Sequence, residues 1–419
     1  MSRILTILTG CALIAGLLVG LPVTPASGTP CWPTPGCSYG PGSFSAVTPG
    51  TERVFDTRTG LGGRLGAVAP GHTVTAHVWG AGTPAAVIEV TVPDAPAGSL
   101  SVYPSGTAWS GRVTMTLVSG GPIQQQLTVA LGADGGVTIR NNSTRAVQLI
   151  VDVLGYYNAG TPTAYGTFAA LDSRILDTRA TSPLPTNHKI TLSLPGLGGI
   201  PAGGASAVVL NIAVLSARAN GLLSVTDRYG SQATVHMRFV GTPATPQTMQ
   251  TERMVTVGSD GTLTFSQSSA ASVQLVIDLM GYFLPGADGV PDVDGHYVPI
   301  GAQPIKNLLA PYGEQLQLYQ HQPLIVNPGF FGYWTLAYNV ILTNDRPGQP
   351  AQLGAYAPDY PWHRTVTVST TPAGQTTERV IGAGSEQVLT LVNLTSAQST
   401  YLHGYVTGYY WYFYCTHNC

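Results

Sequence analysis

Two pairs of cysteines are the residues whose type and spacing point first to a chemistry. Cys31 and Cys37 stand in CWPTPGC, and Cys415 and Cys419 stand in CTHNC. In an oxidising compartment an even number of thiols favours disulfides, and we expect each pair to close on itself. Bridges between the two pairs are the alternative connectivity. Zinc is the alternative chemistry because His417 lies between two thiols, although zinc-ligand cysteines usually stand closer, as CxxC.

Three aspartates in a glycine-containing segment form the next candidate site. Asp288, Asp292 and Asp294 lie close together in PGADGVPDVDGH, and carboxylate oxygens are ligands that calcium prefers. A calcium loop needs about six or more oxygens at defined positions, and this spacing does not match the EF-hand. We therefore predict a polar linker over 286–296, with calcium as the weaker alternative and no other cofactor.

The familiar catalytic motifs are missing from the sequence. It contains no HExxH, GxSxG or GxxxxGK[ST] segment and no GxGxxG that opens a helix. The nine histidines are scattered without metal-ligand spacing, apart from His417. Because a Ser–His–Asp triad is recognised by geometry rather than by sequence, a hydrolase with an unrecognised site stays a distant alternative. We predict a protein without catalytic activity.

Carboxylates inside apolar runs are the fourth feature. The run VQLIVDVLGYY at 147–157 returns as VQLVIDLMGYF at 273–283 and more faintly as YLHGYVTGYY at 401–410. Side chains alternate between the two faces of a strand, and here both faces are largely apolar, so we expect Asp152 and Asp278 to be buried. A buried carboxylate is costly unless a cation or hydrogen-bond donors compensate it.

The matching cations stand in a second repeated motif. RVFDTR ends in Arg58, and RILDTR ends in Arg179. We predict bidentate ion pairs between Arg58 and Asp152 and between Arg179 and Asp278. Such pairs would join the first and last strands of each repeat as structural contacts, not catalytic ones.

The third copy of the pattern supports this pairing. Leu308 stands where the arginine would be, and Tyr405 stands where the carboxylate would be, so both partners are absent together. Asp56 and Asp177 of the same motifs are competitors for the arginines, or caps for the turn that follows.

These motifs mark one domain that occurs three times. The motif aspartates are 177 − 56 = 121 residues apart, far more than a solenoid period, so each copy should fold on its own core. The predicted division is a signal peptide over 1–26, a Cys/Pro/Gly-rich segment over 27–41, repeats over 42–160 and 161–285, an acidic linker over 286–296, a diverged repeat over 297–414 and a Cys-containing tail over 415–419.

An all-β architecture follows from the local pattern. Short segments rich in Val, Thr, Ile, Leu and Tyr alternate with turns, which suits the 51 glycines and 32 prolines. About eight such segments in each copy predict three tandem antiparallel β-sandwich domains, with a jelly roll favoured and an immunoglobulin-like sandwich as the alternative. The core disulfide of antibody domains has no counterpart, since no cysteine lies between Cys37 and Cys415.

The N-terminus has the pattern of an export signal. Arg3 precedes an apolar run at 4–21, and small residues follow, so we predict cleavage after Ala26. Two alternatives would keep the protein at the membrane: acylation of Cys11 in the lipobox-like LTGC, or retention of the uncleaved apolar run. We expect a secreted, extracellular protein, either free or associated with the cell surface.

The charge and the aromatic residues of the chain restrict the classes of binding partner that we expect. Only 9% of residues are charged, with 18 Lys and Arg against 20 Asp and Glu, which argues against a nucleic-acid-binding surface. In GYYWYFYC at 408–415, alternation puts Tyr409, Trp411 and Phe413 on one face, either as a glycan platform or as part of a strand buried on both faces. The same choice between sugar groove and core applies to four tryptophans: Trp79, Trp109, Trp334 and Trp362.

The pair of motifs carries a resemblance to a known family. RVFDTR followed by LIVDVLGYY resembles the tandem β-rich repeat domain of secreted actinobacterial proteins, which occurs in tandem or appended to hydrolases. The resemblance extends over nearly the whole mature chain, with both motifs in two copies and only the closing GYY in the third. It implies an extracellular, non-catalytic module and assigns no catalytic or binding residues.

These features together predict a non-catalytic structural or adhesive protein of the bacterial cell envelope or extracellular space. The expected partners are an envelope component, another extracellular protein or a glycan, and membrane contact is expected only through an uncleaved or lipidated N-terminus. A carbohydrate-binding protein that recognises cell-wall or environmental glycan is the alternative.

Overall fold

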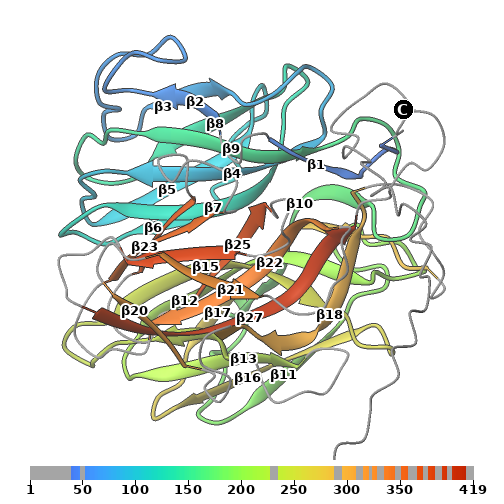
Figure 1. Cartoon of the computed structure of the whole chain (residues 1–419). Coiled ribbons are helices and arrows are strands. Elements are labelled where there is room, and N and C mark those ends of the chain that lie inside the picture. Colours follow the sequence, from blue (N-terminus) through green and yellow to red (C-terminus); the bar gives the residue numbers. More distant parts are fainter. Residues whose placement is uncertain are drawn as a thin grey trace, which may run out of the picture.

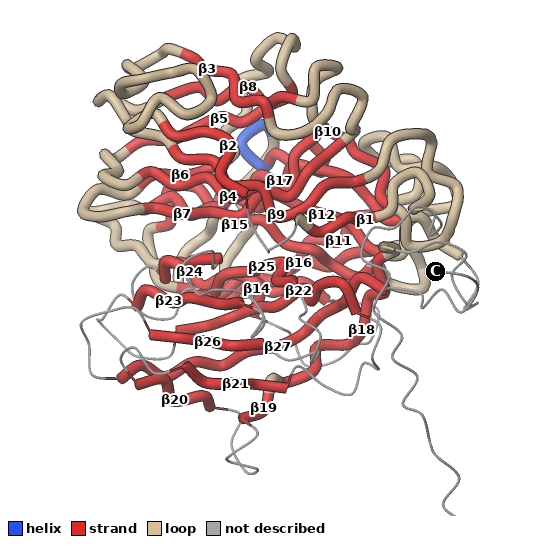
Figure 2. Tube along the Cα trace, turned by 45° about the horizontal axis from the view of Figure 1, so that its top comes forward, coloured by secondary structure: helices blue, strands red, loops and turns tan. Residues whose placement is uncertain are grey.

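The computed structural model describes residues 39–47, 52–226, 235–286 and 295–307 and, beyond these, eight strands between 315 and 411. These residues are almost entirely β-structure, with one short helical turn, η1 (Thr178–Ala180) (Figure 2). No helix in the described part has the length and hydrophobicity that a membrane crossing requires. The predicted signal peptide lies outside the described residues.

The first part of the described chain, which we call unit 1, forms two sheets. Its strands are β1 (Phe44–Ala46), β2 (Glu52–Asp56), β3 (Thr73–His77), β4 (Ala85–Val92), β5 (Gly98–Pro104), β6 (Met115–Leu117), β7 (Ile123–Ala130), β8 (Gly136–Asn141) and β9 (Ile150–Tyr157). One sheet has the order β1-β9-β4-β7, with β2 also paired to β9, and the other has the order β3-β8-β5-β6 (Figure 1).

Unit 2 repeats this arrangement. Its strands are β10 (Phe168–Asp177), β11 (Lys189–Ser193), β12 (Ala207–Ala217), β13 (Gly221–Thr226), β14 (Val235–Phe239), β15 (Gln247–Thr256), β16 (Thr262–Ser269) and β17 (Gln274–Phe283). The two sheets have the orders β10-β17-β12-β15 and β11-β16-β13-β14.

Unit 3 repeats it again with two additional strands. Its strands are β18 (Tyr297–Pro304), β19 (Lys306–Asn307), β20 (Gln315–Tyr319), β21 (Pro323–Asn327), β22 (Thr335–Asn344), β23 (Ala351–Tyr356), β24 (Val366–Thr370), β25 (Thr376–Gly382), β26 (Leu389–Asn393) and β27 (Ser399–Trp411). The sheets have the orders β18-β27-β22-β25 and β19-β21-β26-β23-β24, and β20 pairs with β27.

The strand order of every unit is that of a jelly roll. Counting β2–β9 as the eight strands of unit 1, the first, eighth, third and sixth form one sheet, and the second, seventh, fourth and fifth form the other. Units 2 and 3 follow the same order once β19 and β20 are set aside. The favoured jelly roll is therefore confirmed and the immunoglobulin-like alternative is wrong. Whether each unit folds as an independent domain stays a prediction.

The buried side chains form separate cores and one shared cluster. Units 1 and 2 each enclose a core between their two sheets, built mostly from Val, Ile and Leu. A further cluster joins the three units, and we call it the shared cluster. It consists of Phe44, Ala85, Val87, Leu154 and Tyr157 of unit 1, Phe168, Ala207, Val209, Met254, Met280 and Phe283 of unit 2, and Tyr297, Ala337, Val380 and Tyr410 of unit 3.

The last strand of each unit (β9, β17 or β27), which we call the closing strand, contains a β-bulge that directs side chains to the shared cluster. In β9 the register with β4 shifts so that Leu154 is the extra residue. Val153, before the bulge, belongs to the core of unit 1, whereas Leu154 and Tyr157 belong to the shared cluster. Equivalent shifts make Met280 the extra residue in β17 and Thr407 the extra residue in β27. A single inserted residue moves the following side chains to the other face of a strand.

Candidate functional site

The buried carboxylates of the closing strands have arginine partners, but not the predicted ones. Asp152 accepts hydrogen bonds from Arg53, with Nε–Oδ1 at 2.9 Å and Nη2–Oδ2 at 3.3 Å. Asp278 is held in the same bidentate way by Arg174, at 2.8 and 3.1 Å. The structure thus confirms the need for a cation at each carboxylate and corrects which arginine supplies it.

Arg58 and Arg179 bind the carboxylates of their own motifs instead. The Arg58 guanidinium lies 2.7 and 2.9 Å from the oxygens of Asp56, and that of Arg179 lies 2.6 and 2.9 Å from those of Asp177. Each carboxylate also accepts from the backbone N–H of its arginine and so closes the turn after the strand. The hydrogen bonds from Arg179 lower the pKa of Asp177 to about 2.

Strand register decides which arginine reaches the closing strand. In units 1 and 2 the first arginine of the motif stands directly opposite the aspartate of the antiparallel partner strand. The last arginine follows the end of the strand, which is Asp56 in β2 and Asp177 in β10. In unit 3 the same register places Pro304 opposite Tyr405, so the cation and the carboxylate are absent together there.

Three aromatic rings form a nearly equilateral triangle in the shared cluster. Tyr157, Phe283 and Tyr410 are the last residues of the GYY, GYF and GYY motifs, and their ring centroids lie 6.3, 6.4 and 6.5 Å apart. The hydroxyl groups of Tyr157 and Tyr410 share a hydrogen bond at 2.7 Å, and burial raises the pKa of Tyr157. The repeated closing motif therefore serves contact between units.

A second set of three rings closes the cluster into a ring of six. Phe44, Phe168 and Tyr297 come from the first strand of each unit, and each ring lies between two rings of the triangle. The centroid distances between neighbours run from 4.2 to 5.5 Å. All three side chains are fully buried. The units are thus arranged around an approximate threefold axis.

Backbone hydrogen bonds close the same ring. The N–H groups of the three first-strand aromatics donate to three glycine carbonyls of neighbouring units: Phe44 to Gly295 at 2.7 Å, Phe168 to Gly42 at 2.7 Å and Tyr297 to Gly166 at 2.8 Å. Each glycine has a positive φ, and a Cβ on any of them would collide with the carbonyl oxygen of the next unit's aromatic residue. None of these glycines was predicted to be a contact residue, although the recurring Gly-x-Phe/Tyr at GSF, GTF and GHY was the available signal.

The glycine of the closing motif is also a contact residue. A Cβ on Gly155 would collide with the ring of Phe44, and a Cβ on Gly281 would collide with the ring of Phe168. The aromatic side chain of the first strand therefore packs directly against the backbone of the closing strand at this glycine. This contact explains why glycine stands between the bulge and the two aromatic residues.

Polar side chains add a second layer of contacts between units. The Gln126 amide donates to the Val380 carbonyl at 3.2 Å and accepts from its N–H at 2.6 Å. The Thr128 N–H donates to the Glu252 carboxylate at 2.6 Å. Residues 126, 252 and 378 occupy equivalent positions in β7, β15 and β25. These strands pair with β4, β12 and β22 of their units. In this way unit 1 is hydrogen-bonded to both of the other units.

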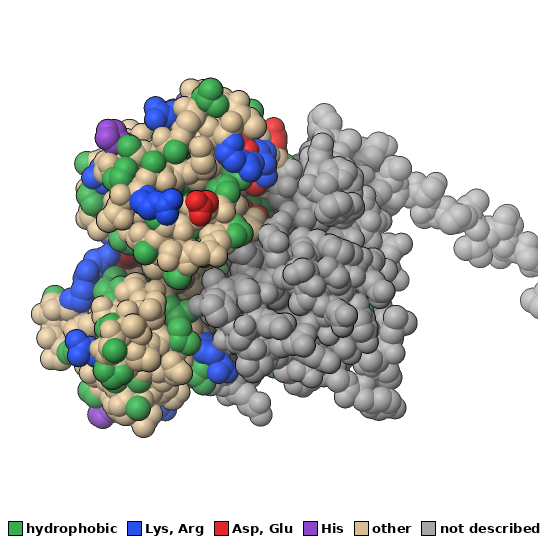
Figure 3. All heavy atoms as spheres, turned by 90° about the vertical axis from the view of Figure 1, so that its left-hand side faces the viewer, with side chains coloured by type: hydrophobic (Ala, Val, Ile, Leu, Met, Phe, Trp, Pro, Cys, Tyr) green, Lys and Arg blue, Asp and Glu red, His purple; other side chains and the backbone are tan. Residues whose placement is uncertain are grey.

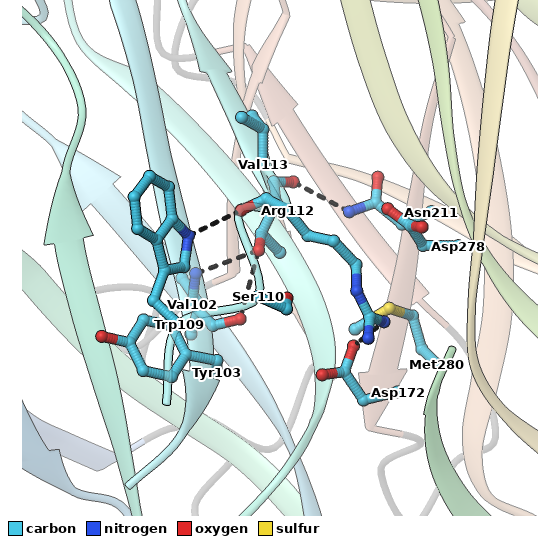
Figure 4. Close-up of a pocket in the computed structure, with 11 residues that line it drawn as sticks. Val102, Tyr103, Trp109, Ser110, Arg112, Val113, Asp172, Asn211, Asp278 and Met280 are labelled. Carbon is cyan, nitrogen blue, oxygen red and sulfur yellow. Dashed lines mark hydrogen bonds and ion pairs between the residues drawn. The ribbon is translucent and has the colours of Figure 1, made fainter. Parts of the chain in front are cut away.

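A small hollow lies between units 1 and 2 (Figure 4). Arg112 of unit 1 crosses it to form an ion pair with Asp172 of unit 2, and burial raises the pKa of Asp172 despite this partner. The cavity volume is about 10 Å³, room for about one water molecule and far below that of a small-molecule site. This hollow is therefore not a substrate pocket.

Trp109 lies at the edge of this hollow and is fixed in place. Its Nε1 donates to Ser101 Oγ at 3.1 Å and to the Arg112 carbonyl at 3.2 Å, and the Arg140 guanidinium lies 4.4 Å from the ring centroid. The side chain is 41% exposed. Of the described tryptophans named as sugar-groove candidates, Trp109 is the one open to solvent, since the half-buried Trp79 stacks on Tyr156 at 4.3 Å.

The end of β27 is divided between its two faces. Tyr410 is fully buried in the shared cluster, while Tyr409 and Trp411 are half-buried neighbours with ring centroids 5.9 Å apart. The alternation predicted for these three residues is confirmed, and Tyr410 has a packing role.

Several predicted site residues lie outside the described part of the chain. These are the cysteines Cys31, Cys37, Cys415 and Cys419, the aspartates Asp288, Asp292 and Asp294, and the tryptophans Trp334 and Trp362. Disulfides, zinc and the calcium alternative therefore stay predictions. Among the described residues no group of three or more His, Cys, Asp or Glu side chains is placed to hold a metal ion.

Comparisons with known proteins add little to this geometry. No protein-family model matches the sequence, and no curated protein does. A structure entitled "The Triple Jelly Roll Fold and Turret Assembly in an Archaeal Virus" is similar over 89% of this chain and 91% of its own, with 10% identity and a TM-score of 0.20.

Two further solved structures show weaker likeness. A chain from the lipid-containing bacteriophage PM2 is 10% identical over 82% of this chain and 98% of its own, with a TM-score of 0.13. The latent dimeric PorU of Porphyromonas gingivalis is 11% identical over 81% of this chain and 33% of its own, with a TM-score of 0.18. Scores this low carry no argument about function.

Proposed function

We propose that the protein is a non-catalytic structural or adhesive component of the bacterial cell envelope or extracellular space. The observation that carries this proposal is the structural role of the repeated residues. The motif arginines and aspartates form ion pairs within units, and the motif glycines and aromatics pack the three units around one axis. Repeated side chains with this role favour a rigid scaffold over an enzyme.

The proposal includes export by the N-terminal signal and short disulfides at both cysteine pairs. It also includes relationship to the tandem repeat domain of secreted actinobacterial proteins, which rests on the RVFDTR and VDVLGYY motifs alone.

Fractionation of the producing cells tests the proposal. The mature protein should be recovered from the medium or the envelope fraction, and purified protein should bind isolated envelopes without turning over peptide, ester or glycoside substrates. Protein found only in the cytoplasm, or hydrolysis that tracks with the purified chain and disappears on substitution of a described residue, would contradict it.

Carbohydrate binding is the second candidate, favoured by Trp109. An exposed indole held by two hydrogen bonds is a preorganised stacking surface for a sugar ring. A glycan array and a peptidoglycan pull-down distinguish the two roles. Retention that free sugar competes away, and that Trp109→Ala abolishes, would favour the second candidate, whereas retention unaffected by either would favour the first.

A further inference from the structure

One end of units 1 and 2 gathers the loops that connect their sheets, and we call it the loop end. In unit 1 it is built by the β2–β3, β4–β5, β6–β7 and β8–β9 connections. Contacts hold these loops together: the Ala95 N–H donates to the Gly121 carbonyl at 3.2 Å, Asp94 lies 4.0 Å from Arg145, and Val68 forms a bridge with Val147. Unit 2 has the same strand order, so its β10–β11, β12–β13, β14–β15 and β16–β17 connections lie at the corresponding end.

Exposed aliphatic side chains concentrate on this end. Five large hydrophobic side chains of the described chain are exposed, and Trp109 is the one that lies elsewhere. The other four are Leu61 (44%), Leu65 (71%), Val118 (48%) and Val240 (39%). They lie in the β2–β3 loop, in the β6–β7 loop and, for Val240, in the equivalent β14–β15 loop of unit 2.

The two leucines stand on the glycine-rich loop that follows β2, and both side chains are exposed. Their segment reads TGLGGRLG, and its glycines adopt positive φ values. Around Gly63 and Gly66 nothing lies within 4 Å of a Cβ position, whereas Gly62 packs on Phe55 and Leu61 forms a bridge with Asp56. The loop is therefore anchored on β2 while both leucine side chains stay exposed to solvent.

The loop end also carries cations that form no ion pair within the described residues. Four exposed basic residues of the loop end form no ion pair within the described residues: Arg64, Lys189, Arg218 and Arg238. At the opposite end the β7–β8 and β15–β16 turns carry Asp134 and Asp260 instead. Figure 3, which views the molecule from the left of Figure 1, shows more Lys and Arg than Asp and Glu over units 1 and 2.

We propose that the loop end of units 1 and 2 binds an anionic lipid surface. Exposed aliphatic side chains gain from burial in a lipid layer, and the cations at the same end are attracted by acidic headgroups. A soluble anionic polymer would satisfy the cations but would offer no apolar layer to Leu61 and Leu65. The proposal goes beyond the structural or adhesive role and adds a membrane contact that does not need the N-terminal run.

Co-sedimentation of the full mature chain with lipid vesicles tests the proposal. Vesicles of phosphatidylcholine mixed with phosphatidylglycerol should retain the protein, and vesicles of phosphatidylcholine alone should retain it much less. The double variant Leu61→Ser/Leu65→Ser should weaken binding to the mixed vesicles at least about tenfold. Arg64→Gln/Arg218→Gln should weaken it about fivefold or more, and salt should reduce that difference.

Trp109→Ala is the matched control, because it removes the exposed hydrophobic side chain that lies away from the loop end. Its binding should equal that of the unchanged protein, and thermal melting should show that every variant is folded. Three outcomes overturn the proposal: no preference for the mixed vesicles, full binding by the leucine variant, or loss of binding in Trp109→Ala alone. Equal binding of a soluble anionic polysaccharide by the unchanged protein and the leucine variant, without vesicle binding, also overturns it and indicates an anionic glycan.

Discussion

The core of each jelly roll and the shared cluster bury apolar surface by different means. The core of unit 2 consists mainly of interdigitating aliphatic side chains such as Leu210 and Ile277 between two sheets. The shared cluster uses large aromatic rings against glycine backbone and adds hydrogen bonds between main chains of different units. Aliphatic cores accept substitution if volume is kept, whereas a close contact at glycine accepts almost none. Assembly of the three units should therefore be more sensitive to substitution than the folding of each core.

Removal of a ring from each region gives the largest expected effect. Phe283→Ala in the shared cluster and Phe265→Ala in the core of unit 2 should each lower the free energy of unfolding by about 3–5 kcal/mol. Differential scanning calorimetry should separate them: Phe283→Ala should split unfolding into more than one transition because the units lose their common contact. A single transition for Phe283→Ala would show that the cluster does not couple the units.

Two glycines with positive φ sharpen the comparison. Ala at Gly63, which has open space around it, should cost only the strain of the left-handed backbone, about 1–2 kcal/mol. Ala at Gly166 should cost about 1–3 kcal/mol more, because its Cβ would lie 2.5 Å from the Tyr297 carbonyl oxygen. Denaturant unfolding measures both. Equal losses would argue against the close contact between units.

A single hydroxyl group tests the polar part of the cluster. Tyr157→Phe removes the hydrogen bond to Tyr410 and should lower the free energy of unfolding by about 1 kcal/mol. The equivalent residue in unit 2 is already Phe283, so the ring itself fits. Tyr156→Phe is the control, since Tyr156 stacks on Trp79 and its hydroxyl forms no hydrogen bond within the described chain. Equal effects of the two substitutions would contradict the assigned bond.

The smallest expected effect is a dependence of stability on pH. Arg179 lowers the pKa of Asp177 from 3.8 to about 2 in the folded chain, so ionised Asp177 stabilises the fold above pH 3.8. That contribution should be lost as the pH falls from about 4 to about 2. Asp177→Asn should show a shallower loss of melting temperature over this range. An unchanged slope would place the acid sensitivity at other carboxylates.

Much of the architecture was predictable from local patterns. Alternating apolar residues, frequent Gly and Pro turns and the recurrence of RVFDTR and VDVLGYY predict a repeated β-sandwich and a buried, paired Asp152. The predicted partner Arg58 is wrong because Arg53 lies within β2 and Arg58 follows its end, and only the antiparallel register shows which of them faces Asp152. Arg58 instead binds both carboxylate oxygens of Asp56, two residues before it in the chain, and so does not pair with Asp152.

The sequence by itself determined the strands, because alternation and turn residues act within a few positions of the chain. It also determined that a cation must meet each carboxylate of the closing strands, because burial of an unpaired charge is too costly. The tertiary structure alone decided that the closing aromatics of three repeats meet on one axis, since contacts between residues such as Tyr157 and Tyr410 depend on the docking of whole units. It also decided the need for glycine at Gly42, Gly166 and Gly295, where the carbonyl of another unit occupies the space of a side chain.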